Sequence, residues 1–253
     1  LYVTSYCDFK LTDHKNCQEQ GIVVYCGPEE FNGIPDTLYQ NNGDGTFTDV
    51  TKSAGIFNPE GKGMMAVWSD YDDDGNLDLF VANDGTENFL YRNNGDGTFT
   101  DIAWIAGVEN DDQGNPQGSM GIDFADYNND GMFDLIITNF QRQLNMLYRN
   151  DGDGLFSDTT FTAGLGYTLP YVSWGIGFFD FDNDSFRDLF IANGHIQDHI
   201  ELYDSSTTYL QPNHLLINNK GSNFMNVSDQ LHLGGLKASR GAAFGDFDND
   251  GDI

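Results

Sequence analysis

Basic side chains are scarce in this 253-residue chain, which has 11 Lys and Arg against 40 Asp and Glu. The formal charge of −29 repels nucleic acid and anionic membranes, so neither is expected as a partner. A disordered acidic chain would be poor in aromatic residues, whereas Phe, Trp and Tyr make up 14% here. Halophilic adaptation would spread the acids evenly, but they fall in short periodic clusters. The clusters therefore indicate ligands.

Long apolar segments are also missing. The longest uncharged run, residues 159–179, is interrupted by Gly, Pro and Thr, so we expect strand, turn and strand there and no membrane span. No long stretch shows the 3.6-residue period of an amphipathic helix, and Gly recurs every few residues. The composition therefore favours an all-β fold of short strands.

Cysteine is rare, and Cys7, Cys17 and Cys26 all lie in the N-terminal segment 1–37. An odd count leaves at least one cysteine without a partner inside the chain. The spacings of 10 and 9 residues fit no usual zinc pattern. We expect a disulfide from Cys26 to either Cys7 or Cys17, as in a secreted protein.

Two alternating signatures dominate the rest of the chain, residues 38–253. One is DYDDDGNLD at 70–78, with copies at 126–134 and 180–188 and an incomplete copy at 246–252. The other is NNGDGTFTD at 41–49 and 93–101, with variants at 150–158 and 218–226. The starts of the first signature are 56, 54 and 66 residues apart. A β-solenoid is the main alternative to a propeller, but its repeats are usually shorter.

One unit is interpreted as four short strands, at 118–125, 135–138, 146–149 and 156–159. Four strands per repeat predict a β-propeller, or part of one, built from four-stranded blades with Asp-rich calcium-binding hairpin loops. Full units are expected at 64–103, 119–160 and 172–228, the last carrying an insertion at 194–213. The last two strands of an earlier blade are expected near 38–40 and 46–51, and a further blade is expected to begin at Arg240.

The Asp-rich loops have the ligand chemistry of Ca²⁺. Carboxylates at positions one, three, five and nine, with the carbonyl of position seven, supply about six or seven oxygens. Two carboxylates about 4 Å apart repel by roughly 4 kcal/mol at an effective dielectric near 20, so the cluster needs a counter-ion. Position twelve holds Val81 or Ile137 where an EF-hand has Glu, so this is a β-hairpin loop. The predicted ligands are Asp70, Asp72, Asp74, Asn76 and Asp78; Asp126, Asn128, Asp130, Met132 and Asp134; Asp180, Asp182, Asp184, Phe186 and Asp188; and Asp246, Asp248 and Asp250.

The copies of the loop differ. Asn128 lowers the charge of the second loop but keeps an oxygen, whereas Ser185 replaces the turn glycine of the third. Arg187 stands beside Asp188, so the third site should be the weakest complete one. The fourth loop stops before position nine, so its site should be empty or completed from outside.

The Asp-rich loops resemble those of FG-GAP/VCBS-type repeats, which form the propeller of integrin α-chains and many bacterial surface proteins. Several stretches resemble the cartilage acidic protein family, with its ASPIC/UnbV relatives, more closely. They are VYCGP at 24–28, LYRNNGDGTFTD at 90–101, LFIANGHIQD at 189–198, YLQPNHLLINN at 209–219 and SRGAAFGDFDNDGD at 239–252. The resemblance implies a secreted or surface Ca²⁺-binding propeller with a binding rather than a catalytic role.

Other residues carry weaker signals. The NNGDG segments are interpreted as hairpin turns held by Asn and Asp side chains. His195 and His199 are four residues apart, but the preceding Asn-Gly favours a loop with ordinary hydrogen-bonding histidines over a metal site. Trp68, Trp104 and Trp174 are expected to pack between blades.

The expected function is that of an extracellular calcium-binding module, structural or adhesive, with a protein or glycan partner at the cell surface or matrix or with other copies of itself. The alternatives are a calcium-dependent hydrolase or lyase and a repeat subunit of a surface filament. An enzyme would need a site with spare coordination and a base nearby, and the loops look self-sufficient in oxygens. We also expect this stretch not to close into a complete ring, because a ring of six or seven blades needs roughly 100 to 200 more residues.

Overall fold

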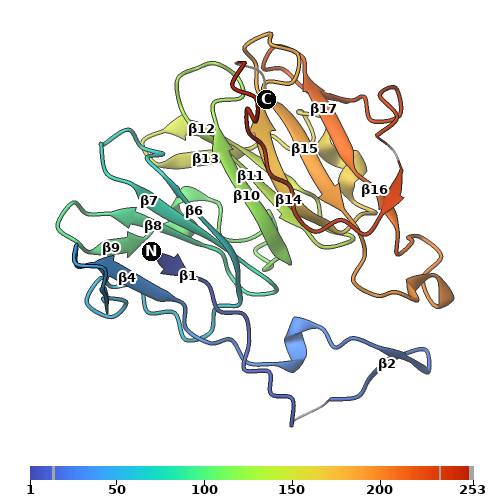
Figure 1. The fold of residues 1–253 in the computed structure, drawn as a ribbon, viewed down its shortest axis with the longest axis horizontal. Coiled ribbons are helices and arrows are strands. Elements are labelled where there is room, and N and C mark those ends of the chain that lie inside the picture. The colour runs from blue at the N-terminus through green and yellow to red at the C-terminus, as the bar shows by residue number, and fades with distance from the viewer. Residues whose placement is uncertain (13–14, 234, 251–253) are drawn as a thin grey trace.

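The structure is a computed structural model that describes residues 1–12, 15–233 and 235–250. The described residues form an all-β fold in which three four-stranded antiparallel sheets follow one another along the chain (Figure 1). In each sheet the strand order is the chain order. The strands are β6 (Gly63–Ser69), β7 (Asp78–Asn83), β8 (Phe89–Asn93) and β9 (Phe99–Asp101); β10 (Ser119–Ala125), β11 (Asp134–Asn139), β12 (Met146–Gly152) and β13 (Leu155–Asp158); and β14 (Ser173–Phe179), β15 (Asp188–Asn193), β17 (His214–Asn218) and β18 (Phe224–Asn226).

The second strand of each sheet is buried on both faces, as its continuous apolar run predicts. Every residue of β7 is buried. Alternate side chains point to opposite faces of a strand, so Leu79 packs in a cluster with Leu38 of the preceding sheet. Phe80 packs in a cluster with Ile122 of the following sheet. A third cluster joins Ile136 of β11 to Leu189 of β15. The core is therefore divided among the spaces between successive sheets.

Among the first strands, β10 packs against both β6 and β14, and the sheets fan out from these strands in Figure 1. This arrangement is consistent with a propeller-like fold. The three units predicted from the repeats are confirmed, with strand ends within a few residues of the expected positions. The insertion in the third unit lies between β15 and β17 and holds a 3-10 helix, Ile200–Leu202, and the short strand β16 (Gln211–Pro212).

A smaller sheet precedes these three and is formed by β1 (Tyr2–Val3), β4 (Thr37–Asn41) and β5 (Phe47–Asp49). The pair β4 and β5 was predicted, but β1 was not. Tyr2 of β1 pairs with Leu38 of β4 in the same way that Phe80 of β7 pairs with Leu90 of β8. β1 therefore occupies the position of the second strand in this sheet.

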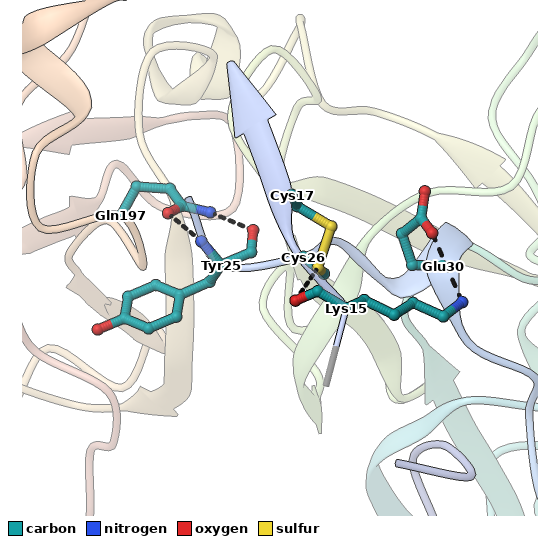
Figure 2. The surroundings of a disulfide bond; sticks show 6 residues. All are labelled: Lys15, Cys17, Tyr25, Cys26, Glu30 and Gln197. Carbon is teal, nitrogen blue, oxygen red and sulfur yellow. Dashed lines mark hydrogen bonds and ion pairs between the residues drawn. A yellow bond between two sulfur atoms is a disulfide. The ribbon is translucent and has the colours of Figure 1, made fainter. Parts of the chain in front are cut away.

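The N-terminal segment also contains a hairpin of β2 (Cys17–Glu19) and β3 (Ile22–Val24), followed by a 3-10 helix, Pro28–Glu30. A disulfide joins Cys17 to Cys26, which confirms one of the two predicted pairings, and Cys7 is free. Figure 2 shows the contact that holds this hairpin against the insertion of the third unit. The Gln197 side chain accepts a bond from the Tyr25 N–H and donates one to the Tyr25 carbonyl, at 2.9 and 2.8 Å.

Beyond the third sheet, β19 (Leu236–Lys237) pairs with β16, and the chain then runs along β14. The Gly175 N–H donates to the Arg240 carbonyl at 3.0 Å, and the ring of Phe244 stacks on Phe179. The predicted start of a further blade at Arg240 thus lies beside β14, although residues 238–250 are not assigned to a strand. Residues 251–253, at the end of the fourth loop, lie outside the described residues.

The prediction that all three tryptophans pack between sheets is wrong. Trp104 is 74% exposed, because the short helix α1 (Ala103–Ala106) buries its two alanines and turns Trp104 outward. Trp68 is 37% exposed and lies beside Phe99 of its own sheet. Trp174 lies where two sheets meet, since its carbonyl accepts a bond from Thr138.

A third short 3-10 helix, Leu165–Thr168, precedes β14. None of the helices in the described part of the chain has the length and apolarity that a membrane crossing requires.

Candidate metal centres

Each of the three complete Asp-rich loops connects the first and second strands of its unit and is shaped by its first carboxylate. Asp70 Oδ1 accepts the N–H of Asp74, and Asp70 Oδ2 accepts the N–H of Gly75, both at 3.0 Å. Asp126 and Asp180 make the same pair of bonds in their loops. Hydrogen bonds to the Asp at position one therefore curl the backbone around the loop centre without the help of an ion.

The tight curl requires left-handed backbone at two positions. Position six has φ of 87° at Gly75 and 91° at Gly131, as the glycine predicts, and 74° at Ser185. Position four is left-handed as well, for example with φ of 56° at Asp73, and this was not predicted from the sequence. The signal was present, because position four is always Asp or Asn, the residues that tolerate this conformation best after glycine.

The loops bring carboxylates together. Asp70, Asp72 and Asp78 each offer one oxygen such that all three atoms lie within 4.8 Å of one another. Asp180, Asp182 and Asp188 form the same group in the third loop. In the fourth loop the group consists of Asp246, Asp248 and Asp250, all exposed.

The second loop differs at position three. The Asn128 amide donates to Asp130 Oδ2 at 2.9 Å, and its Oδ1 accepts the N–H of Asp130 at 2.9 Å. The carboxylates at the predicted ligand positions of this loop are therefore three, those of Asp126, Asp130 and Asp134, where the first loop has four. One of the three, Asp130, already accepts a hydrogen bond from the Asn128 amide.

Positions five and seven are linked in every complete loop. Asp74 Oδ1 accepts the N–H of Asn76 at 2.8 Å. The equivalent bonds join Asp130 to Met132 and Asp184 to Phe186, both at 2.9 Å. One oxygen of each position-five carboxylate is thus occupied in holding the loop. In the second loop the other oxygen of Asp130 also has a partner, because it accepts the Asn128 amide.

Position nine is the most buried, since Asp78, Asp134 and Asp188 have no exposed surface. Burial raises the pKa of Asp78 to about 6 and that of Asp134 to about 7, and it also raises the pKa of Asp188. A buried carboxylate of this kind is stabilised by a proton or by a cation, because either removes the cost of an uncompensated charge.

The first loop has oxygens that lack hydrogen-bond partners. Asp72 Oδ1 and Asp78 Oδ2 are both buried without a partner. The atoms equivalent to Asp78 Oδ2 accept backbone N–H groups in the other loops, from Tyr127 to Asp134 and from Phe181 to Asp188. In the first loop the Tyr71 N–H lies close enough to the Asp78 carboxylate to lower its pKa, but it does not form a hydrogen bond of normal geometry with it. Buried oxygens without partners fit a hard cation such as Ca²⁺.

The NNGDG segments have the role that the sequence predicted. The Gly43 N–H donates to Asn41 Oδ1 at 2.8 Å, and the Thr46 N–H donates to Asp44 Oδ1 at 2.9 Å. The segment at 93–98 repeats both bonds. These segments are hairpin turns closed by their own side chains.

His195 is an ordinary hydrogen-bonding residue, as expected. It is buried, its Nε2 lies 3.2 Å from Gln141 Oε1, and its Nδ1 accepts the N–H of Gln197 at 3.0 Å. Burial lowers its pKa to about 4, so the ring is neutral near pH 7. His199 is exposed and lies 3.8 Å from Asp198.

The chain belongs to the FG-GAP-like repeat family, whose model matches residues 23–81, 70–137 and 126–191, together more than half of the chain. Cartilage acidic protein 1 from Homo sapiens and from Xenopus tropicalis are each 33% identical to it over 118 residues. The protein of that name from Mus musculus is 32% identical over the same length. The match covers 46% of this chain and 17% of each relative. Both resemblances inferred from the sequence are therefore confirmed.

A solved structure of an Agrocybe aegerita lectin, described as recognising non-reducing terminal N-acetylglucosamine, superposes with a TM-score of 0.40. The two sequences are 19% identical, and the match covers 87% of this chain and 49% of the lectin chain.

Proposed function

We propose that this chain is part of a calcium-binding β-propeller in which the ions hold the Asp-rich loops rigid. The observation that carries the proposal is the convergence of carboxylate oxygens from Asp70, Asp72 and Asp78 in the first loop, where Asp72 Oδ1 and Asp78 Oδ2 are buried without partners. Asp70, Asp72, Asp74 and Asp78 would hold the ion there, with the carbonyl of Asn76 as a further ligand. The ion supplies the positive charge that compensates these carboxylates.

The second and third loops would hold ions through the corresponding residues. Asn128 and Met132 would replace Asp72 and Asn76 in the second loop, and Asp182 and Phe186 would do so in the third. The third loop should bind most weakly of the three, because Ser185 holds it in a strained backbone conformation.

A binding role outside the cell follows from this proposal. Rigid loops on adjacent sheets would present a fixed rim to a protein or glycan partner of the cell surface or matrix, or to a second copy of the chain. The disulfide between Cys17 and Cys26 supports a secreted or surface location, where such bonds persist. The name of the relatives, cartilage acidic protein, is consistent with a matrix setting.

Calcium titration by calorimetry, combined with thermal unfolding, tests the proposal. Each loop filled at about 100 times its dissociation constant should add roughly 2.7 kcal/mol to the free energy of unfolding. Asp130→Ala should remove the heat of the second loop and leave the heats of the others. A melting temperature that is unchanged by chelator, with no heat of calcium binding, would overturn the proposal.

A further inference from the structure

Asn150 lies near the end of β12, the third strand of the middle sheet. Its side chain is 2% exposed and donates from Nδ2 to two carbonyls. One is Phe133, at 3.1 Å in the loop of its own sheet, and the other is Tyr71, at 2.8 Å in the loop of the preceding sheet. The backbone N–H of Asn150 donates to Asp134 Oδ1 at 2.9 Å. One residue thus contacts two Asp-rich loops.

The arrangement is repeated one sheet later. Asn218, also 2% exposed, donates to the carbonyl of Tyr127 in the preceding loop and to that of Arg187 in its own, both at 2.8 Å. Its backbone N–H donates to Asp188 Oδ1 at 2.7 Å. Two independent copies with nearly the same distances make this a feature of the repeat.

Asn93 provides a comparison within the chain. It donates to the Leu77 carbonyl of its own loop at 3.0 Å and to Asp78 Oδ1 at 2.8 Å. The sheet before it, formed by β1, β4 and β5, has an NNGDG turn but no Asp-rich loop. The contact across sheets therefore occurs where a preceding Asp-rich loop exists to receive it.

We propose that Asn150 and Asn218 are positioning residues that couple the first and the second Asp-rich loop, respectively, to the sheet that follows it. The inference rests on the proposed calcium function. The carbonyl of Tyr71 lies between Asp70 and Asp72 in the chain, so fixing its peptide group fixes the spacing of two ligands. Removing the donor leaves a buried carbonyl without a partner and lets that peptide rotate. Calcium affinity in one sheet then depends on a side chain of the next.

The test isolates the first loop. Asp130→Ala, Asp184→Ala and Asp250→Ala together disable the other loops, and the calcium dissociation constant of the remaining loop is measured by calorimetry. In this background Asn150→Ala should weaken binding about tenfold, as loss of an outer-shell partner does at other metal sites. Asn94→Ala is the matched control, because Asn94 is an exposed asparagine whose side chain pairs with the threonines of its own turn. It should leave the affinity unchanged.

A second readout needs no calcium. In chelator, the amides of Asp74 and Gly75 should exchange hydrogen faster in Asn150→Ala than in the parent protein. If the parent binds no calcium but this exchange difference appears, the proposed function fails and the coupling stands. If affinity and exchange are both unchanged in folded Asn150→Ala, the coupling is overturned.

Asn218→Ala serves if Asn150→Ala does not fold. With Asp74→Ala, Asp184→Ala and Asp250→Ala disabling the other loops, Asn218→Ala should weaken calcium binding by the second loop about tenfold through the Tyr127 carbonyl. An unchanged dissociation constant there would equally overturn the inference.

Discussion

Ser185 shows what a single substitution does to a repeated loop. It occupies the position that is glycine in the first two loops, with φ of 74° against 87° and 91°. A side chain added at Gly75 or Gly131 would meet no atom within 4 Å, so space does not decide the choice of residue. The cost of serine at this position is therefore the left-handed backbone itself.

Ser185→Gly should stabilise the protein by about 1 kcal/mol in the absence of calcium, because it relieves this strain. Urea unfolding in chelator measures the change. The reciprocal substitution, Gly131→Ser, should destabilise the protein by a similar amount at the same position of the second loop. If both substitutions shifted the unfolding midpoint in the same direction, the strain would not be the cause.

At the scale of elements, the hairpin of β2 and β3 is held by a disulfide and by two contacts with the insertion of the third unit. The disulfide closes it, and the side chain of Gln197 ties it to the insertion of the third unit through the backbone of Tyr25. Gln20 adds a bond to the Tyr203 carbonyl at 3.2 Å. The N-terminal segment is thus attached to residues more than 170 positions away.

Replacing both Cys17 and Cys26 with serine should loosen this hairpin without unfolding the four-stranded sheets. Closing so short a loop restricts the open chain by roughly 2 to 3 kcal/mol, so hydrogen exchange in residues 17–24 should accelerate accordingly. Exchange in β11 should not change. Cys7→Ser is the control and should leave both regions as they are; faster exchange in β11 of the double variant would contradict the local role.

The sequence predicted those elements whose information is local. The apolar runs at 79–82 and 135–138 and the Gly-Asp-Gly turns place the strands of each sheet, and the Asp spacing places the loops. It did not predict β1, because two residues carry no pattern and the pairing of Tyr2 with Leu38 depends on the finished fold. The Asn150 contact with Tyr71 was missed for the same reason, since nothing local distinguishes Asn150 from Asn93.

At the scale of the whole molecule, the formal charge of −29 causes electrostatic repulsion that all the sheets share. The Asp-rich loops lie on neighbouring sheets, and the second and third touch through a bond of 3.2 Å from Asn129 to the Ser185 carbonyl. Repulsion among the loops opposes folding, and each bound Ca²⁺ would cancel two charges where the repulsion is greatest.

Salt should therefore stabilise the metal-free protein more than the calcium-loaded one. Raising NaCl from about 10 mM to about 150 mM shortens the screening length from about 30 Å to about 8 Å. Thermal unfolding with chelator should show the larger rise in melting temperature, and unfolding in millimolar calcium the smaller. Equal rises in both conditions would show that the loops do not dominate the repulsion.

The contact from Asn150 back to Tyr71 also bears on how the protein is made. A chain emerges from the ribosome from its N-terminus, so the first loop is complete in sequence well before the residue that positions its peptide is synthesised, 79 positions later. The residue that positions the second loop, Asn218, is likewise synthesised 91 positions after Tyr127. Each of these two loops would reach its full affinity only after the next sheet has folded, so they would take up calcium one after the other along the nascent chain.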